Sequence, residues 1–203
     1  MHNHFDRNLG VKNLILLLKP KVLIECGAGG GENTVQLLSL MDEYSFSLTV
    51  VSDGERSPDE EFQIYADRHG VNLNGHLKEL VWIRGVSYIE LKTFCDNSVD
   101  FVLIDTDHNY WTLREELNAL TSKLKVGGVV VMHDTETYGH NSGRGNAYHC
   151  GVAYPGDEIA ICEREGLGMR DAILEILSTG NYFKLAETKE SHGATVLLKV
   201  RNV

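Results

Sequence analysis

The chain of 203 residues is long enough for one domain with a substantial core, and we expect a single domain over 1–203. Its hydrophobic fraction of 42% and charged fraction of 24% are ordinary for a globular protein, and its net charge of −10 argues against nucleic acid or an anionic membrane as the main partner. With no signal-peptide pattern, no apolar run of membrane-spanning length and no zinc-ligand spacing among the cysteines, the expected location is the cytoplasm.

Strands and helices alternate along the chain as far as Asp134. A helical N-terminal segment is expected within 1–20, ending before Pro20. Apolar strands are predicted at 22–26, 47–52, 80–83, 99–104 and 129–132. Helices are predicted at 33–41, 58–70 and 111–124. Continuously apolar strands separated by helices indicate a parallel sheet that is covered on both faces.

The alternation stops after Asp134. Residues 135–160 are rich in glycine and histidine and lack periodicity, which predicts a long active-site loop. A helix near 167–177 follows, and strands at 182–187 and 194–200 are joined by a turn short enough to make them antiparallel. We therefore expect an α/β fold: a doubly wound, Rossmann-like, seven-stranded, mostly parallel sheet with an antiparallel strand near the C-terminus.

Polar side chains follow the carboxyl ends of the predicted parallel strands. In doubly wound sheets ligands bind at this edge, although exposed strand ends carry polar residues in any case. The side chains concerned are Glu25, Asp53, Ser87, Asp105, His108, His133 and Asp134.

The first of these strand ends is followed by a glycine-rich stretch. A dinucleotide-binding turn needs a third glycine where Glu32 stands, and an acid there would repel a pyrophosphate. Glu25, directly before the glycines, could instead meet a cationic group. A tight corner without any ligand is the alternative.

The run from Glu25 to Gly31, "ECGAGGG", resembles the first motif of class I S-adenosylmethionine-dependent methyltransferases. The resemblance implies that Glu25 and the glycine backbone hold the amino-acid end of S-adenosyl-L-methionine, that Asp53 binds its ribose, and that Gly85 and Ser87 line its adenine. Taken alone, Asp53 could be a turn residue and Ser87 a helix start. The full set of expected cofactor-binding residues is Glu25, Gly27, Ala28, Gly29, Thr34, Asp53, Gly85, Ser87 and Asp105.

Two later motifs indicate which branch of this methyltransferase class the chain resembles. "DTDHNY" at 105–110 and "LKVGGVVVMHD" at 124–134 resemble metal-dependent O-methyltransferases of the macrolide-sugar and aminocoumarin tailoring type, with cephalosporin-hydroxylase-like relatives. This implies a divalent cation, magnesium or manganese, on Asp105, His133 and Asp134. It also implies catalytic roles for His108, as the base, and for Asp105.

Two of these assignments leave alternatives open. His133 stands where the resemblance leads us to expect an acid, so it favours manganese, iron or zinc over magnesium, or does not bind the ion. His108 has an ordinary pKa that suits a base at neutral pH, but it could be a structural histidine. The other candidate bases are His140 and His149.

The sequence thus predicts an S-adenosylmethionine-dependent, metal-assisted O-methyltransferase that acts on a hydroxyl of a sugar or natural-product small molecule. The expected partner is this hydroxylated acceptor, with no nucleic acid and no membrane, and a homo-oligomer is left open. The alternatives are an NAD-linked oxidoreductase, against which Glu32 counts, and a non-catalytic cofactor-binding protein of the same fold.

Overall fold

The computed structural model describes residues 10–52, 58–73, 80–139, 166–190 and 192–202. Asp53, His140, His149 and most of the predicted loop at 135–160 lie outside these residues. In the described part of the chain, no helix combines the length and the apolar character needed to cross a bilayer. The two cysteines described there, Cys26 and Cys95, are both unpaired.

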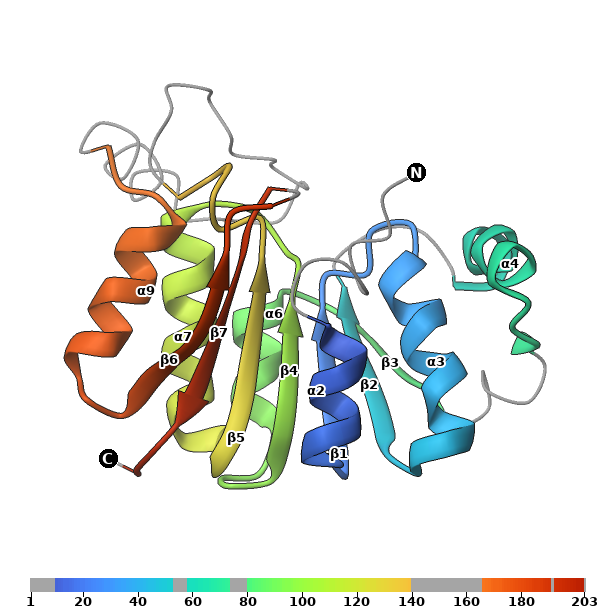
Figure 1. Ribbon diagram of the computed structural model, residues 1–203, viewed down its shortest axis with the longest axis horizontal. Helices are drawn as coiled ribbons and strands as arrows, with labels where there is room; N and C mark the ends of the chain where they lie inside the picture. Colours follow the sequence, from blue (N-terminus) through green and yellow to red (C-terminus); the bar gives the residue numbers. More distant parts are fainter. Residues whose placement is uncertain (1–9, 53–57, 74–79, 140–165, 191, 203) are drawn as a thin grey trace.

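Seven strands form one sheet in the order β3-β2-β1-β4-β5-β7-β6 (Figure 1). The strands are β1 (Val22–Cys26), β2 (Ser47–Ser52), β3 (Val81–Arg84), β4 (Val99–Ile104), β5 (Leu124–His133), β6 (Tyr182–Thr188) and β7 (Ala194–Lys199). The first five strands are parallel, and β7 runs antiparallel to both of its neighbours. The predicted fold class is therefore confirmed.

The fifth strand is longer than the sequence predicted. It begins at Leu124, not at Val129, and includes Gly127 and Gly128. Val99 pairs with Leu124, but Phe101 pairs with Val129, so the register shifts in between. Glycines inside a strand often mark such an irregularity, and the pattern of apolar residues alone does not separate a bulge from a strand start.

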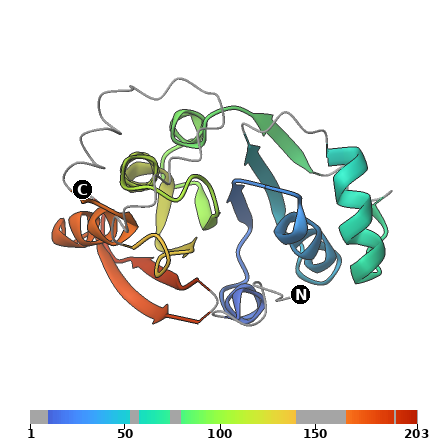
Figure 2. The ribbon, with the colours of Figure 1, turned by 90° about the horizontal axis from the view of Figure 1, so that it is seen from above.

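Helices cover both faces of the sheet (Figure 2). They are α2 (Val11–Leu18), α3 (Glu32–Tyr44), α4 (Pro58–His69), α6 (Ser87–Glu90), the 3-10 helix η1 (Leu91–Thr93), α7 (Tyr110–Lys123) and α9 (Met169–Ser178). Strand β4 shows the division between the two faces. Phe101 and Leu103 pack with α2, α3 and α4, whereas Val102 and Ile104 pack with α7 and α9. This alternation along a buried strand creates one core on each side of the sheet.

The strand order reverses between β1 and β4, which lie side by side in the centre of the sheet. The chain leaves β1 toward α3 on one face and leaves β4 toward α7 on the other. The amide of Asp105 donates a hydrogen bond to the carbonyl oxygen of Cys26 at 2.8 Å, so the two strand ends stay joined where these connections diverge. Such a switch point is where open α/β sheets bind ligands.

Candidate active site

The turn between β1 and α3, residues 27–31, is shaped by its glycines and is called the glycine turn below. Gly27 has a φ of 84°, and a Cβ on it would lie 2.2 Å from the carbonyl oxygen of Asp105. A Cβ on Gly31 would overlap the ring of Phe62. At Gly29, by contrast, a Cβ would have no neighbour within 4 Å among the described residues. The turn is held by packing at both ends, and at Gly29 it is open to an approaching ligand.

Glu25 lies fully buried at the end of β1, next to this turn. The Thr34 hydroxyl donates to Glu25 Oε2 at 2.6 Å, whereas no hydrogen bond within the described residues reaches Oε1. Burial raises the pKa of Glu25 to about 8; the bond from Thr34 opposes this shift, and the charge of Asp105 adds to it. An orphaned carboxyl oxygen fits a ligand that brings an N–H donor and a positive charge.

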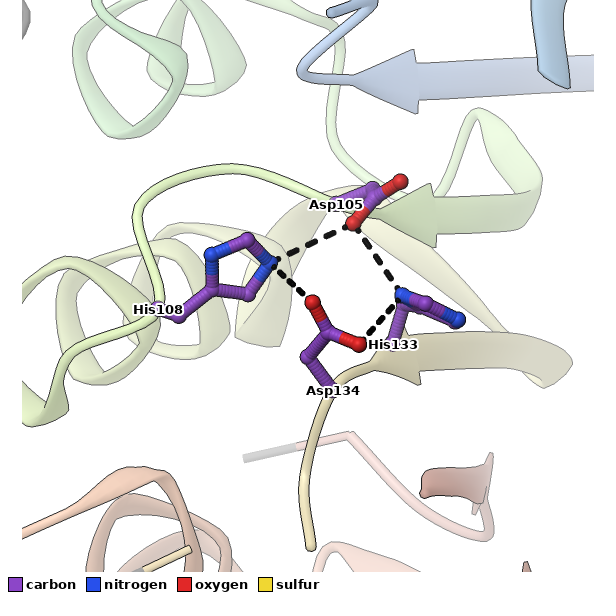
Figure 3. A group of neighbouring side chains, drawn as sticks. All are labelled: Asp105, His108, His133 and Asp134. Carbon is purple, nitrogen blue, oxygen red and sulfur yellow. Dashed lines mark hydrogen bonds and ion pairs between the residues drawn. The ribbon is translucent and has the colours of Figure 1, made fainter. Parts of the chain in front are cut away.

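Four side chains from the ends of β4 and β5 converge on one another (Figure 3), and one of them, Asp105, packs against Gly27 of the glycine turn. Asp105 and His108 follow β4, while His133 ends β5 and Asp134 comes next. One ligand atom from each residue lies within 4.8 Å of the others. Since β4 and β5 pair in register up to Ile104 and Met132, their ends bring these residues together. We call this group the His/Asp cluster.

Each histidine of the cluster contacts both aspartates. His108 Nε2 lies 2.9 Å from Asp134 Oδ2 and 3.4 Å from Asp105 Oδ1. His133 Nδ1 lies 2.9 Å from Asp134 Oδ1 and 3.3 Å from Asp105 Oδ1. The predicted metal ligands Asp105, His133 and Asp134 are therefore brought together. The predicted base, His108, also points its Nε2 into the same group.

The charges of the His/Asp cluster compensate one another. Burial by itself would lower the pKa of each histidine. Hydrogen bonds to the aspartates outweigh this effect and raise the pKa of His108 to about 9 and that of His133 to about 10. Burial likewise opposes ionisation of the aspartates, yet the bonds from the histidines lower the pKa of Asp105 to about 2 and also lower that of Asp134. Two carboxylates and two imidazoles are a donor set that suits divalent transition metals.

Three features that support the cluster were not predicted from the sequence. Asn33, in the first turn of α3, donates to Asp105 Oδ2 at 3.0 Å, which leaves Oδ1 to face the histidines. The ring of Tyr138 stacks on His108 with centroids 4.7 Å apart. Asp134 has a φ of 60°, a conformation that aspartate tolerates better than most residues. These contacts depend on tertiary structure, and no local pattern indicates them.

The segment predicted to line adenine begins α6. Gly85 donates its amide to the carbonyl oxygen of Ser52 at 3.1 Å, and Ser87 is buried with its hydroxyl donated to Glu116. Glu116 was also missed, although the sequence contains a signal: an acid that stands on the apolar stripe of α7, between Leu113 and Leu120.

Comparisons with known proteins identify the family of this chain. The family described as "Methyltransferase domain" matches residues 24–135, more than half of the chain and all of the glycine turn and His/Asp cluster. No protein with a curated description matches the chain.

Several solved structures share the fold. A candidate caffeoyl-CoA O-methyltransferase from Staphylococcus aureus is 18% identical, with a TM-score of 0.61 over 93% of this chain and 80% of its own. The SAH-bound methyltransferase PaMTH1 of Podospora anserina is 14% identical, with a TM-score of 0.62 over 93% of this chain and 76% of its own. A candidate rRNA methylase from Clostridium thermocellum is 14% identical, with a TM-score of 0.61 over 97% of both chains.

The family match covers the residues that could bind a cofactor, and it favours methyl transfer over the NAD-linked alternative. The chain belongs to the methyltransferase domain family and is an S-adenosylmethionine-dependent methyltransferase.

Proposed function

We propose that this chain is a metal-assisted O-methyltransferase that acts on a hydroxyl of a small molecule, such as a sugar or a natural product. The observation that carries the proposal is the His/Asp cluster, whose Asp105 packs against Gly27 of the glycine turn at the same edge of the sheet. A cofactor bound on that turn and an acceptor bound at the cluster would be neighbours. The resemblance to tailoring O-methyltransferases in "DTDHNY" supports the choice of a hydroxyl acceptor.

The glycine turn and Glu25 are the proposed site for the amino-acid end of S-adenosyl-L-methionine. The open space at Gly29 and the unpaired Oε1 of Glu25 support this assignment. An ammonium group would supply the missing donor, directly or through a bridging water. The remaining proposed contacts are Gly27, Ala28, Thr34 and Asp105 around the turn, Asp53 for the ribose, and Gly85 and Ser87 for the adenine.

Asp105, His133 and Asp134 are the proposed ligands of a divalent cation. Their mixed oxygen and nitrogen donors suit manganese better than magnesium, which prefers oxygen ligands throughout. When bound, the cation lowers the pKa of a hydroxyl that it contacts, and S-adenosylmethionine supplies an electrophilic methyl group.

His108 is the proposed base that accepts the proton of the acceptor hydroxyl. Its Nε2 faces the carboxylates of Asp105 and Asp134, and the stacked ring of Tyr138 restricts how the imidazole can turn. His108 acts as a base only when it is neutral. Its hydrogen bonds to Asp105 and Asp134 raise its pKa to about 9, which keeps it protonated at neutral pH. A positive charge in the cluster would favour the neutral form.

The first experiment tests the cofactor and the metal separately. Calorimetry on cofactor-stripped protein should show binding of S-adenosylmethionine and none of NAD, and Mn²⁺ should bind more tightly than Mg²⁺. Failure to bind S-adenosylmethionine would contradict the assignment of the glycine turn. Methyl transfer that is unchanged by a chelator would contradict the role of the metal.

The second experiment separates the roles of two cluster residues. His108→Asn should keep the affinity for Mn²⁺ within about threefold but lower kcat by roughly 10²–10⁴-fold, the usual contribution of a general base. Asp105→Asn should weaken Mn²⁺ binding itself. If His108→Asn weakens Mn²⁺ binding as much as Asp105→Asn does, His108 is a ligand and the base assignment is wrong. Wild-type protein that binds S-adenosylmethionine but methylates no hydroxylated acceptor would contradict the choice of a hydroxyl acceptor.

A further inference from the structure

Glu116 is a buried acid in a place where the fold alone would favour an apolar residue. It lies on α7 with no exposed surface, one turn after Leu113 and one turn before Leu120, both of which pack in the core on this face of the sheet. In the described residues it forms no ion pair, and its carboxyl group is held by two hydroxyls alone. Burial raises the pKa of Glu116 to about 8, against the opposing effect of these two bonds. Such a group costs stability that a leucine would not.

The two hydroxyls come from different turns at the ligand-binding edge of the sheet. Ser87, at the start of α6, follows β3 and donates to Glu116 Oε1. Thr106 follows β4, directly after Asp105, and donates at 2.9 Å to Oε1 and 3.1 Å to Oε2. Strands β2 and β1 lie between β3 and β4 in the sheet. Glu116 therefore joins two turns that no strand pairing connects.

Each of these turns carries a different part of the proposed site. Thr106 lies between Asp105, which contacts both histidines of the cluster, and the segment that leads to His108. Ser87 belongs to the proposed adenine-lining segment. A shift of the Glu116 carboxyl group would therefore move the two parts relative to each other.

We infer that Glu116 is a positioning residue, whose buried carboxyl group fixes Thr106 and Ser87 and so sets the His/Asp cluster relative to the start of α6. This inference rests on the proposed function for the identity of the two ligands. Residues that orient metal ligands without touching the metal matter for affinity. Their removal typically weakens metal binding by about 10–100-fold.

The decisive variant replaces the whole buried network: Ser87→Ala, Thr106→Val and Glu116→Leu in one protein. Replacing all partners of a hydrogen-bonded group by apolar side chains leaves no unpaired donor and can be neutral for stability. We expect a Tm no lower than that of the wild type, with the Kd for Mn²⁺ raised about tenfold or more and the Kd for S-adenosylmethionine also raised. A purely structural role predicts a lower Tm and an unchanged Kd for Mn²⁺, which is the discriminating value because Ser87 is itself a proposed cofactor contact.

Single variants assign the two halves of the network. Thr106→Val should mainly weaken Mn²⁺ binding, and Ser87→Ala should mainly weaken S-adenosylmethionine binding. The matched control is Glu115→Ala on the same helix, since Glu115 pairs with Lys92 and Arg114 near the surface and should leave both Kd values unchanged.

The outcomes distinguish this inference from the proposed function. If the wild type does not bind S-adenosylmethionine, the proposed function fails. If the wild type binds both ligands and the folded triple variant binds them equally well, the inference about Glu116 is overturned. If the triple variant does not fold, the single variant Thr106→Val replaces it in the test. A folded Thr106→Val protein that binds Mn²⁺ with wild-type affinity would then overturn the inference.

Discussion

Asp105, His108, His133 and Asp134 form a compact group in which two imidazolium ions offset two carboxylates. A divalent cation bound by these residues must compete with protons on the imidazoles, because a histidine binds metal only in its neutral form. The affinity for the cation is therefore expected to rise with pH through the range in which the histidines lose their protons. The choice of metal, by contrast, would depend on the mixture of oxygen and nitrogen donors.

The first prediction concerns His133→Asp, which exchanges an imidazole for a third carboxylate. We expect Mg²⁺ to bind about tenfold more tightly and Zn²⁺ more weakly, because oxygen donors suit magnesium and imidazole suits zinc. Without metal, the Tm should fall, since His133 Nδ1 lies 2.9 Å from Asp134 Oδ1 and a carboxylate there adds like charge. Calorimetry and thermal melts with each metal measure both effects. An unchanged order of metal preference would show that His133 is not a ligand.

The second prediction concerns Glu25→Gln and the pH dependence of stability. The pKa of Glu25 is raised from 4.5 to about 8 in the folded protein, so between these values the native state holds a proton that the unfolded state has released. The free energy of unfolding therefore falls as pH rises through this window. Glutamine cannot ionise but can still accept the hydrogen bond from Thr34. Glu25→Gln should flatten the decline of Tm between pH 5 and pH 8.5.

The same variant should bind S-adenosylmethionine more weakly, because glutamine, unlike glutamic acid, cannot release a proton and become negatively charged when an ammonium group binds beside it. Glu190→Gln is a suitable control, since Glu190 is exposed on the turn between β6 and β7. If the control and Glu25→Gln show the same dependence of Tm on pH, the buried acid does not account for the loss of stability.

At the scale of elements, the sequence predicts those features that follow from strand order. The convergence of Asp105 with His133 and Asp134 was predicted because parallel neighbours end at the same edge. The contact of Asn33 with Asp105 was not, since it depends on how α3 is rotated over the end of β4. The register shift near Gly127 was not predicted either, because such a shift leaves the apolar pattern of each strand intact.

The third prediction compares two glycines of one turn. Gly27→Ala places a Cβ 2.2 Å from the carbonyl oxygen of Asp105 in addition to the cost of a positive φ, so it should destabilise the protein by roughly 3 kcal/mol or more. In Gly29→Ala the added Cβ meets no neighbour within 4 Å among the described residues, so only the cost of a positive φ remains, about 1 kcal/mol. This variant should nevertheless weaken S-adenosylmethionine binding, since the Cβ occupies the open part of the turn.

Denaturant unfolding and calorimetry test this pair of glycines. Equal losses of stability in the two variants would contradict the packing described for the glycine turn. Unchanged cofactor affinity in folded Gly29→Ala would contradict the turn as the place where the cofactor approaches.

At the scale of the whole molecule, the fold does not determine the acceptor. The same arrangement of strands and helices occurs in a candidate caffeoyl-CoA O-methyltransferase and in a candidate rRNA methylase. A fold hosts many activities, and the acceptor is determined by the surface around the site. The net charge of this chain bears on the choice of acceptor, because a protein that binds RNA must neutralise phosphates. With 29 acidic and 19 basic residues, this chain has a net charge of −10, which opposes such binding.

The last prediction follows from this charge and uses the salt dependence of methyl transfer. A reaction with a small hydroxylated acceptor should change by less than about twofold between 50 and 200 mM salt. An RNA acceptor held by six to ten phosphate contacts would lose about 10³–10⁵-fold in affinity over the same range. Cofactor binding measured over the same range corrects for any effect of salt on that step. A steep fall in acceptor affinity would show that a basic surface recognises a polyanion despite the net charge, and would overturn the small-molecule assignment.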